Sequence, residues 1–224
     1  MTQLDSLPEA ARTKLLAYLD AILTINERLN LTAVRDREEA IARHLDESLE
    51  LTPFIESIAG GIKGARLVDV GTGGGFPGVP LAAALPELRV ELIEAREKKA
   101  RAVEEALKEA GLPALPVHAE RVETLGRGEL RERFDIAVAR ALADLPTLLE
   151  LTLPLVRVGG ALLAIKGERA EEELSRSARA LRELGGELRS IERIPSATLL
   201  RIEKIAPTPK RYPRRPGEPK RSPL

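Results

Sequence analysis

Glycines clustered between positions 71 and 78 are the residues best suited to bind a ligand. The segment 68–78 reads VDVGTGGGFPG and begins in an apolar run, and a helical stretch follows it. Glycine lacks the Cβ atom that would block an approaching ligand, and the start of a helix offers free N–H groups. The sequence therefore predicts a ligand-binding loop between a strand and a helix.

Two classes of nucleotide-like ligand fit this loop. Gly73, Gly75 and Gly78 match the dinucleotide pattern G-x-G-x-x-G, and Glu94 follows about twenty residues later, where a carboxylate can accept ribose hydroxyls. Pro77, however, removes a backbone donor near the helix start, where a pyrophosphate would need one. S-adenosylmethionine has no phosphate, and Glu94 would serve its ribose equally well. The residues favour S-adenosylmethionine, with a nicotinamide-dependent oxidoreductase as the alternative.

The elements around the loop predict an α/β fold. Short apolar runs alternate with helical stretches, as in a parallel sheet with crossover helices. Two further runs are separated only by Pro195, Ser196 and Ala197, so they should pair antiparallel. We therefore expect a Rossmann-like domain of the class I methyltransferase type, with a seven-stranded, mostly parallel sheet and a terminal antiparallel hairpin. The expected strands are 67–70, 90–94, 115–118, 136–139, 161–165, 188–194 and 198–205, with amphipathic helices near 100–110 and 168–184.

Three segments are expected along the chain: an N-terminal helical extension over 1–60, the ligand-binding domain over 61–206 and a basic, proline-rich tail over 207–224. Capping boxes at Ser6 with Glu9 and at Asp36 with Glu39 predict two opening helices, the second stopped by Pro53. The tail contains six prolines and is expected to be extended and mobile when unbound.

Composition excludes several classes of protein. The 224 residues include no cysteine and only two histidines, so a thiolate or histidine-rich metal centre is not expected. The sequence contains no stretch of 18 uncharged apolar residues that could span a membrane, and we therefore expect a cytoplasmic protein. Nothing in the sequence requires more than a monomer. The 35 basic and 35 acidic residues balance, but the last fifteen positions hold six cations against Glu218 alone.

Several motifs resemble one known family in the correct order. They are ERLNLTAVRD, VDVGTGGGFPG, LIEAREKK, AERVE, AVARALADL, LLAIKG and the ending RYPRRPGEPKRSPL. Together they resemble the ribosomal RNA small-subunit methyltransferase G family, also called glucose-inhibited division protein B. One departure lies at His44-Leu45-Asp46-Glu47-Ser48, because the family's His-x-x-Asp-Ser has an aspartate where this chain has Glu47, or the acid has moved to Asp46.

This resemblance implies transfer of a methyl group from S-adenosylmethionine to N7 of one guanosine in 16S rRNA, as free RNA or within the small ribosomal subunit. Matching positions imply a cofactor site in which loop residues touch the cofactor, residues after the second strand lie by the ribose and residues after the third strand frame the adenine. The loop residues are Gly71, Gly73 and Phe76, the ribose residues are Glu94, Ala95 and Arg96, and the adenine residues are Val122 and Glu123. Arg140 is also expected at the cofactor or the target.

Other residues are candidates for contact with RNA. Arg140 and Lys166 follow expected parallel strands at the carboxyl ends, where open α/β sheets bind ligands. His44 borders an apolar helix face and is more typical of a structural hydrogen-bonding histidine than of a substrate contact, and the same holds for His118. In the tail, cationic side chains can neutralise phosphates and an aromatic ring can stack on an unpaired base. These tail candidates are Arg211, Tyr212, Arg214 and Arg215.

The expected chemistry needs no catalytic acid or base. Guanine N7 carries an in-plane lone pair and no proton, so in-line placement against the methyl group suffices. We find no nucleophile arrangement and assign no catalytic residue. A non-catalytic RNA-binding or assembly protein would explain the tail, but it would leave the glycine loop without a purpose.

Overall fold

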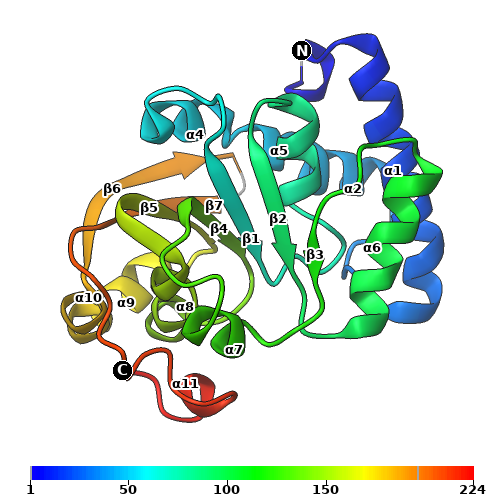
Figure 1. Ribbon diagram of the computed structural model, residues 1–224. Coiled ribbons are helices and arrows are strands. Elements are labelled where there is room, and N and C mark those ends of the chain that lie inside the picture. Colours follow the sequence, from blue (N-terminus) through cyan, green and yellow to red (C-terminus); the bar gives the residue numbers. More distant parts are fainter. Residues whose placement is uncertain (1, 196) are drawn as a thin grey trace.

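The computed structural model describes residues 2–195 and 197–224, and it contains one seven-stranded sheet. The strand order is β3-β2-β1-β4-β5-β7-β6, with β7 antiparallel to both of its neighbours and the other pairs parallel. The predicted fold is therefore confirmed, including the terminal hairpin (Figure 1). The strands are β1 Arg66–Val70, β2 Arg89–Ile93, β3 Val117–His118, β4 Phe134–Arg140, β5 Val156–Lys166, β6 Gly186–Ile194 and β7 Ala197–Lys204.

Helices cover both faces of the sheet, which explains the continuous apolar runs of the central strands. Alternate residues of β1 enter different cores. Leu67 packs in the core under α1 (Glu9–Leu29) and α6 (Glu97–Glu109). Val68 and Val70 pack in the core under α7 (Val122–Arg127), α8 (Leu145–Thr152) and α10 (Ala178–Leu184). Figure 1 shows these two helical layers on opposite sides of the strands. The helices of the domain are α5 Gly78–Ala84, α6 Glu97–Glu109, α7 Val122–Arg127, α8 Leu145–Thr152, the 3-10 turn η3 Leu153–Leu155, α9 Ala170–Ser175 and α10 Ala178–Leu184.

The single helix expected over 168–184 is two helices. The Oγ of Ser177 donates to the carbonyl of Glu173 (2.7 Å), and the chain turns between α9 and α10 at this point. Serine competes with the backbone for hydrogen bonds and so interrupts the helix. The turn between β6 and β7 was expected at 195–197, but Ser196 lies outside the described residues.

The N-terminal extension departs from two expectations. Its first long helix begins at Glu9 after Pro8, and the Ser6 hydroxyl donates to the carbonyl of Gln3, so the predicted Ser6 cap is wrong. The Asp36 cap is confirmed, because its carboxylate accepts the N–H of Glu39 (2.8 Å). Pro53 was expected to stop the second helix, but the helical stretch after Asp36 already ends at Leu49. Pro53 instead lies in the first turn of the next helix, where proline is well tolerated. The elements are the 3-10 turn η1 Leu4–Ser6, α1 Glu9–Leu29, α2 Arg37–Ala40, the π-helix η2 Ile41–Asp46, α3 Glu47–Leu49 and α4 Thr52–Ala59.

The tail packs against the domain, so the prediction of an extended, mobile segment is wrong. Arg131 donates to the carbonyls of Thr208 and Tyr212, and the Lys204 ammonium donates to the Thr208 hydroxyl (2.7 Å). Prolines remove backbone donors and leave carbonyls to be satisfied. Here cationic side chains of the domain satisfy them, and the tail ends in the short helix α11 Glu218–Arg221.

None of the described helices combines the length and apolar character that crossing a membrane requires.

Candidate functional site

The glycine loop joins the carboxyl end of β1 to α5, as predicted, but its glycines have different tasks. Gly71 and Gly73 adopt positive φ angles of 74° and 56°. A Cβ atom on Gly75 would overlap the hydroxyl of Tyr18, and one on Gly78 would overlap Leu92. Two of the three glycines that fit the dinucleotide pattern are therefore explained by packing within the protein.

Asp69 occupies the helix start that a phosphate would need. Its Oδ2 accepts the N–H of Gly78 (2.9 Å), the first residue of α5, and the hydroxyl of Thr72 (2.6 Å). Burial raises the pKa of Asp69 to about 6 in spite of these hydrogen bonds. A second anion beside this carboxylate would be repelled, so the loop suits a ligand without phosphate.

A cavity of about 940 Å³ opens beside the loop, at the carboxyl ends of β1, β4 and β5. Its opposite wall comes from the N-terminal extension, through residues 31–34 and η2. It brings together six of the predicted site residues, namely Gly71, Gly73, Phe76, His44, Arg140 and Lys166. Segments 31–34, 71–76, 140–144 and 165–169 form most of its lining.

Arg140 connects β4 to the N-terminal extension. Its guanidinium donates to the carbonyl of Arg43 and to Nδ1 of His44 (3.1 Å), and it lies 3.7 Å from a carboxylate oxygen of Glu47. All three partners belong to η2 or the residue after it. The acid that departs from the family motif, Glu47, is therefore part of this cavity, whereas Asp46 instead accepts the N–H of Leu4 (2.9 Å).

His44 is a neutral, fully bonded histidine on the cavity wall. Burial, and after it the Arg140 charge, lower its pKa to about 4. Because its Nδ1 accepts from Arg140, its Nε2 carries the proton and donates to the Thr32 hydroxyl (2.6 Å). The ring stacks on Phe76, with centroids 4.7 Å apart. His118 likewise has a structural partner, a Glu91 oxygen 2.8 Å away.

Lys166 fixes the loop that follows β4. Its ammonium lies 2.6 Å from Oε2 of Glu173 and donates to the carbonyl of Ala143 (2.7 Å). The same Glu173 oxygen accepts the N–H of Leu145 (2.9 Å), the first residue of α8. Both charged side chains are less than one-tenth exposed. The pair is thus a buried clamp on residues 143–145, and not a surface salt bridge.

The remaining predicted cofactor residues follow β2 and β3, outside the cavity lining. The N–H groups of Gly71 and Thr72 donate to the carbonyl of Ile93, so the glycine loop lies directly against the end of β2. Glu94 Oε1 accepts the N–H of Arg96 (2.9 Å), which orients this carboxylate. Ala95 lies between them. The two predicted adenine-site residues, Val122 and Glu123, begin α7 and are both buried.

Comparison with known proteins identifies the family. The family model described as rRNA small subunit methyltransferase G matches residues 11–199. The chain belongs to this family. The protein of that name from Acetivibrio thermocellus is 40% identical over 218 residues, covering 94% of this chain and 88% of that protein. The one from Chloroflexus aggregans is 44% identical over 213 residues, covering 92% and 87%.

Solved structures support the fold alone. A SAM-dependent O-methyltransferase from Thermotoga maritima aligns with a TM-score of 0.52 at 16% identity, covering 84% of this chain and 72% of that one. A ribosomal protein L11 methylase from Lactobacillus delbrueckii subsp. bulgaricus aligns with a TM-score of 0.53 at 20% identity, covering 72% and 80%.

The four tail residues expected at RNA face different ways in this member of the methyltransferase G family. Tyr212 is 5% exposed and its hydroxyl bonds Glu183, so its ring offers no free face for a base. Arg214 pairs with the fully buried carboxylate of Glu150 (2.6 Å). Arg211 lies over the Tyr212 ring, 3.7 Å from a Glu183 oxygen. Only Arg215 is both exposed and without an ion pair among the described residues.

Sequence reasoning missed several residues of the site. Asp69 and Glu173 gave no local signal, because a single acid in a strand or a helix is common. Thr32 lies in the motif NLTA between the opening helices, where Asn26 bonds the backbone of Thr32 through both its amide and its carbonyl groups. An asparagine near the end of a helix, before a short polar loop, was the signal available for this wall of the cavity.

Proposed function

We propose that this protein transfers the methyl group of S-adenosylmethionine to N7 of a guanosine in 16S rRNA. One observation carries the proposal: the glycine loop borders a cavity at the carboxyl ends of β1, β4 and β5, and its helix start is already occupied by the Asp69 carboxylate. Open α/β sheets bind ligands at this edge. The occupied helix start favours a sulfonium nucleoside over a dinucleotide, and membership of the methyltransferase G family gives the target.

The residues present fit such a cofactor. Backbone groups of Gly71 and Gly73 would hold its methionine part beside Phe76. Glu94, whose carboxylate is oriented by the N–H of Arg96, would accept the ribose hydroxyls. At α7, the Oε2 atom of Glu123 is buried and has no hydrogen-bond partner among the described residues, as expected where an adenine amine would donate. Ala95 and Val122 would pack against the nucleoside.

When bound, the cofactor supplies an electrophilic methyl group, and the protein must only place the guanine against it. No proton leaves N7, so neither a general base nor a charged histidine is needed. His44 is neutral, and Arg140 is held by three partners of the N-terminal extension. Methylation leaves a positive charge on the guanine ring. Glu47, a cavity carboxylate, would stabilise that charge, while Arg140 would contact guanine O6 or a phosphate and Lys166 would hold residues 143–145 in place.

The partner is rRNA, and we propose specifically 16S rRNA, either free or in the small subunit. We also propose that the protein works as a monomer in the cytoplasm and without a metal ion. What supports the monomer is that both walls of the cavity come from one chain.

The decisive experiment incubates the protein with labelled S-adenosylmethionine and 16S rRNA that lacks this methylation. Digestion to nucleosides should place the label in 7-methylguanosine. Calorimetry with S-adenosylmethionine and with NAD separates the alternatives, because the oxidoreductase would bind NAD and an assembly protein would bind neither. If the protein binds the cofactor but leaves every guanosine of the rRNA unlabelled, the proposed target is wrong.

A further inference from the structure

The C-terminal strap, defined here as residues 207–224, crosses the edge of the molecule that carries the proposed cofactor site. The N–H of Gly217 donates to Oε1 of Glu123 (2.9 Å) at the start of α7. Two residues later, the carbonyl of Pro219 accepts the hydroxyl of Thr147 (3.3 Å) in the first turn of α8. The helix α11 therefore lies between the amino ends of α7 and α8.

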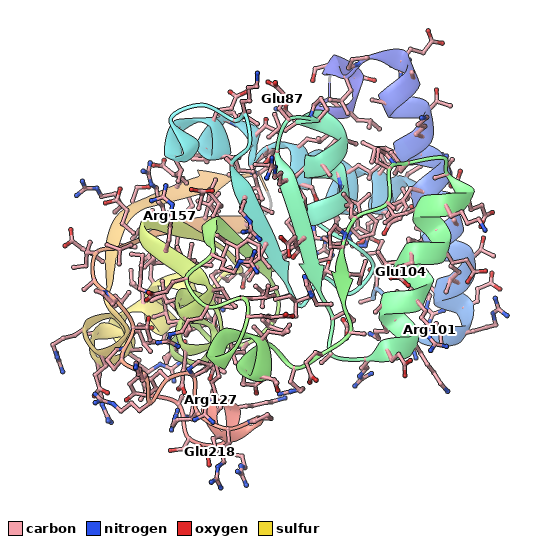
Figure 2. The ribbon with its side chains drawn as sticks, in the orientation of Figure 1. Glu87, Arg101, Glu104, Arg127, Arg157 and Glu218 are labelled. Carbon is pink, nitrogen blue, oxygen red and sulfur yellow. The ribbon has the colours of Figure 1, made fainter. Side chains whose placement is uncertain are left out.

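Both contacts place α11 at the rim of the site. Thr147 is three residues beyond Asp144, which lines the cavity, and that separation is about 4.5 Å of helix rise. Glu123 is the residue proposed to meet the adenine. Figure 1 shows α11 beyond α7 and α8, at the end of the molecule toward which β1 and β2 point. Figure 2 shows the labelled side chains of Arg127 and Glu218 at this same end, with Glu87 at the opposite one.

The strap is anchored by side chains that turn inward. Arg214 makes a bidentate pair with Glu150, whose side chain has no exposed surface. The Tyr212 hydroxyl bonds Glu183, and the Arg127 guanidinium donates to the carbonyl of Pro213 (2.6 Å). These contacts order the strap before any RNA binds, so binding need not be accompanied by the entropic cost of folding a mobile tail.

The remaining cations of the strap turn outward. Arg215, Lys220 and Arg221 are exposed, and within the described part of the chain no carboxylate lies close enough to form a salt bridge with them. The nearby acid Glu218 uses one oxygen to accept the N–H of Arg215 (3.3 Å). These three side chains therefore keep their full charge available for a polyanion.

Building on the proposed function, we propose that Arg215, Lys220 and Arg221 form a preordered phosphate-binding surface. It holds the RNA strand next to the target guanosine, while Tyr212 and Arg214 serve only as anchors. The occupant is RNA and not a lipid surface, because the large exposed apolar side chains of the described residues are Val158, Ile191 and Ile205, none of which belongs to the strap.

Salt dependence gives the size of the effect. Three contacts to single-stranded phosphates should contribute a slope of about −2 to the plot of log affinity against log salt. Between 50 and 200 mM salt, the native protein should then lose roughly 20-fold more affinity for its RNA than a variant without these contacts.

The test replaces Arg215, Lys220 and Arg221 by glutamine in the full-length protein. A matched control replaces Lys63, Arg89 and Arg133, which are exposed cations at the amino ends of β1, β2 and β4. Affinity for undermethylated 16S rRNA is measured across that salt range, with label transfer, S-adenosylmethionine binding and thermal unfolding measured in parallel.

We expect the strap variant to show a salt slope smaller by about 2 and a KM for RNA raised about ten-fold, with kcat and cofactor affinity unchanged. The control should behave as the native protein. An unchanged slope in the strap variant, or an equal loss in the control, would overturn the assignment of this surface. By contrast, a native protein that binds RNA but forms no 7-methylguanosine would refute the proposed function and not the surface.

Discussion

Breaking the buried clamp of Lys166 and Glu173 should destabilise the fold by several kcal/mol. Glu173 Oε2 accepts from both the Lys166 ammonium (2.6 Å) and the Leu145 N–H (2.9 Å). Replacing Glu173 by leucine leaves the ammonium buried, with the carbonyl of Ala143 as its one remaining partner among the described residues, which should cost about 3–5 kcal/mol of unfolding free energy. For a chain of this length, that loss lowers the melting temperature by roughly 6–20 °C.

Replacing Lys166 by methionine should cost a similar amount, because the Glu173 carboxylate then keeps, among the described residues, only the N–H of Leu145 as a donor. The double variant should be far less destabilised than the sum of the two, since an apolar pair carries no unmatched charge. Urea unfolding of the four proteins measures the coupling, which we expect to exceed about 2 kcal/mol. Losses that simply add would show that the two charges do not interact, and the clamp on residues 143–145 would have to be abandoned.

Three further changes test other parts of the site. Gly75→Ala should destabilise the fold by about 3 kcal/mol or more in urea unfolding, because the added Cβ atom would overlap the Tyr18 hydroxyl. The control Gly111→Ala, also at positive φ but facing open space, should cost only about 1 kcal/mol. Equal losses in the two variants would contradict the overlap with Tyr18. His44 has a pKa of about 4 in the folded protein, below its unfolded value. Its contribution to the unfolding free energy, up to about 3 kcal/mol, is therefore complete above pH 6.5 and is lost as the pH falls toward 4. The difference in unfolding free energy between the native protein and His44→Gln should shrink over that pH range. Arg140→Ala should slow methyl transfer about ten-fold or more without unfolding, and a native rate would remove Arg140 from the site.

The sheet and its loop could be predicted because they rest on local pattern. Strands buried on both faces are continuous apolar runs, and a glycine cluster directly after such a run indicates its own conformation. Pro77 correctly argued against a phosphate at the start of α5. The full reason, that the Asp69 carboxylate already accepts the N–H of Gly78, needs the fold, since nine residues separate the two positions.

The strap shows why local pattern was insufficient elsewhere. Six prolines correctly exclude regular structure over most of the strap, but they do not decide whether the segment is free or docked. Docking depends on Arg131, Lys204 and Glu150, whose distance from the strap along the sequence gives no hint of contact. The same limit explains Tyr212: an aromatic ring among cations is typical of RNA contact, yet here it fills a core position.

The N-terminal extension belongs to the site and does not merely cover it. Tyr18 donates to the carbonyl of Gly74 (2.9 Å) and meets Gly75, so α1 determines the shape of the glycine loop. Through Thr32 and His44, the extension also holds Arg140 at the end of β4. A methyl transfer that needs no acid or base depends mainly on how well its two substrates are aligned. In such an enzyme, the residues that fix the walls of the cavity determine how the substrates are aligned. Here those residues come from the N-terminal extension and from the sheet domain.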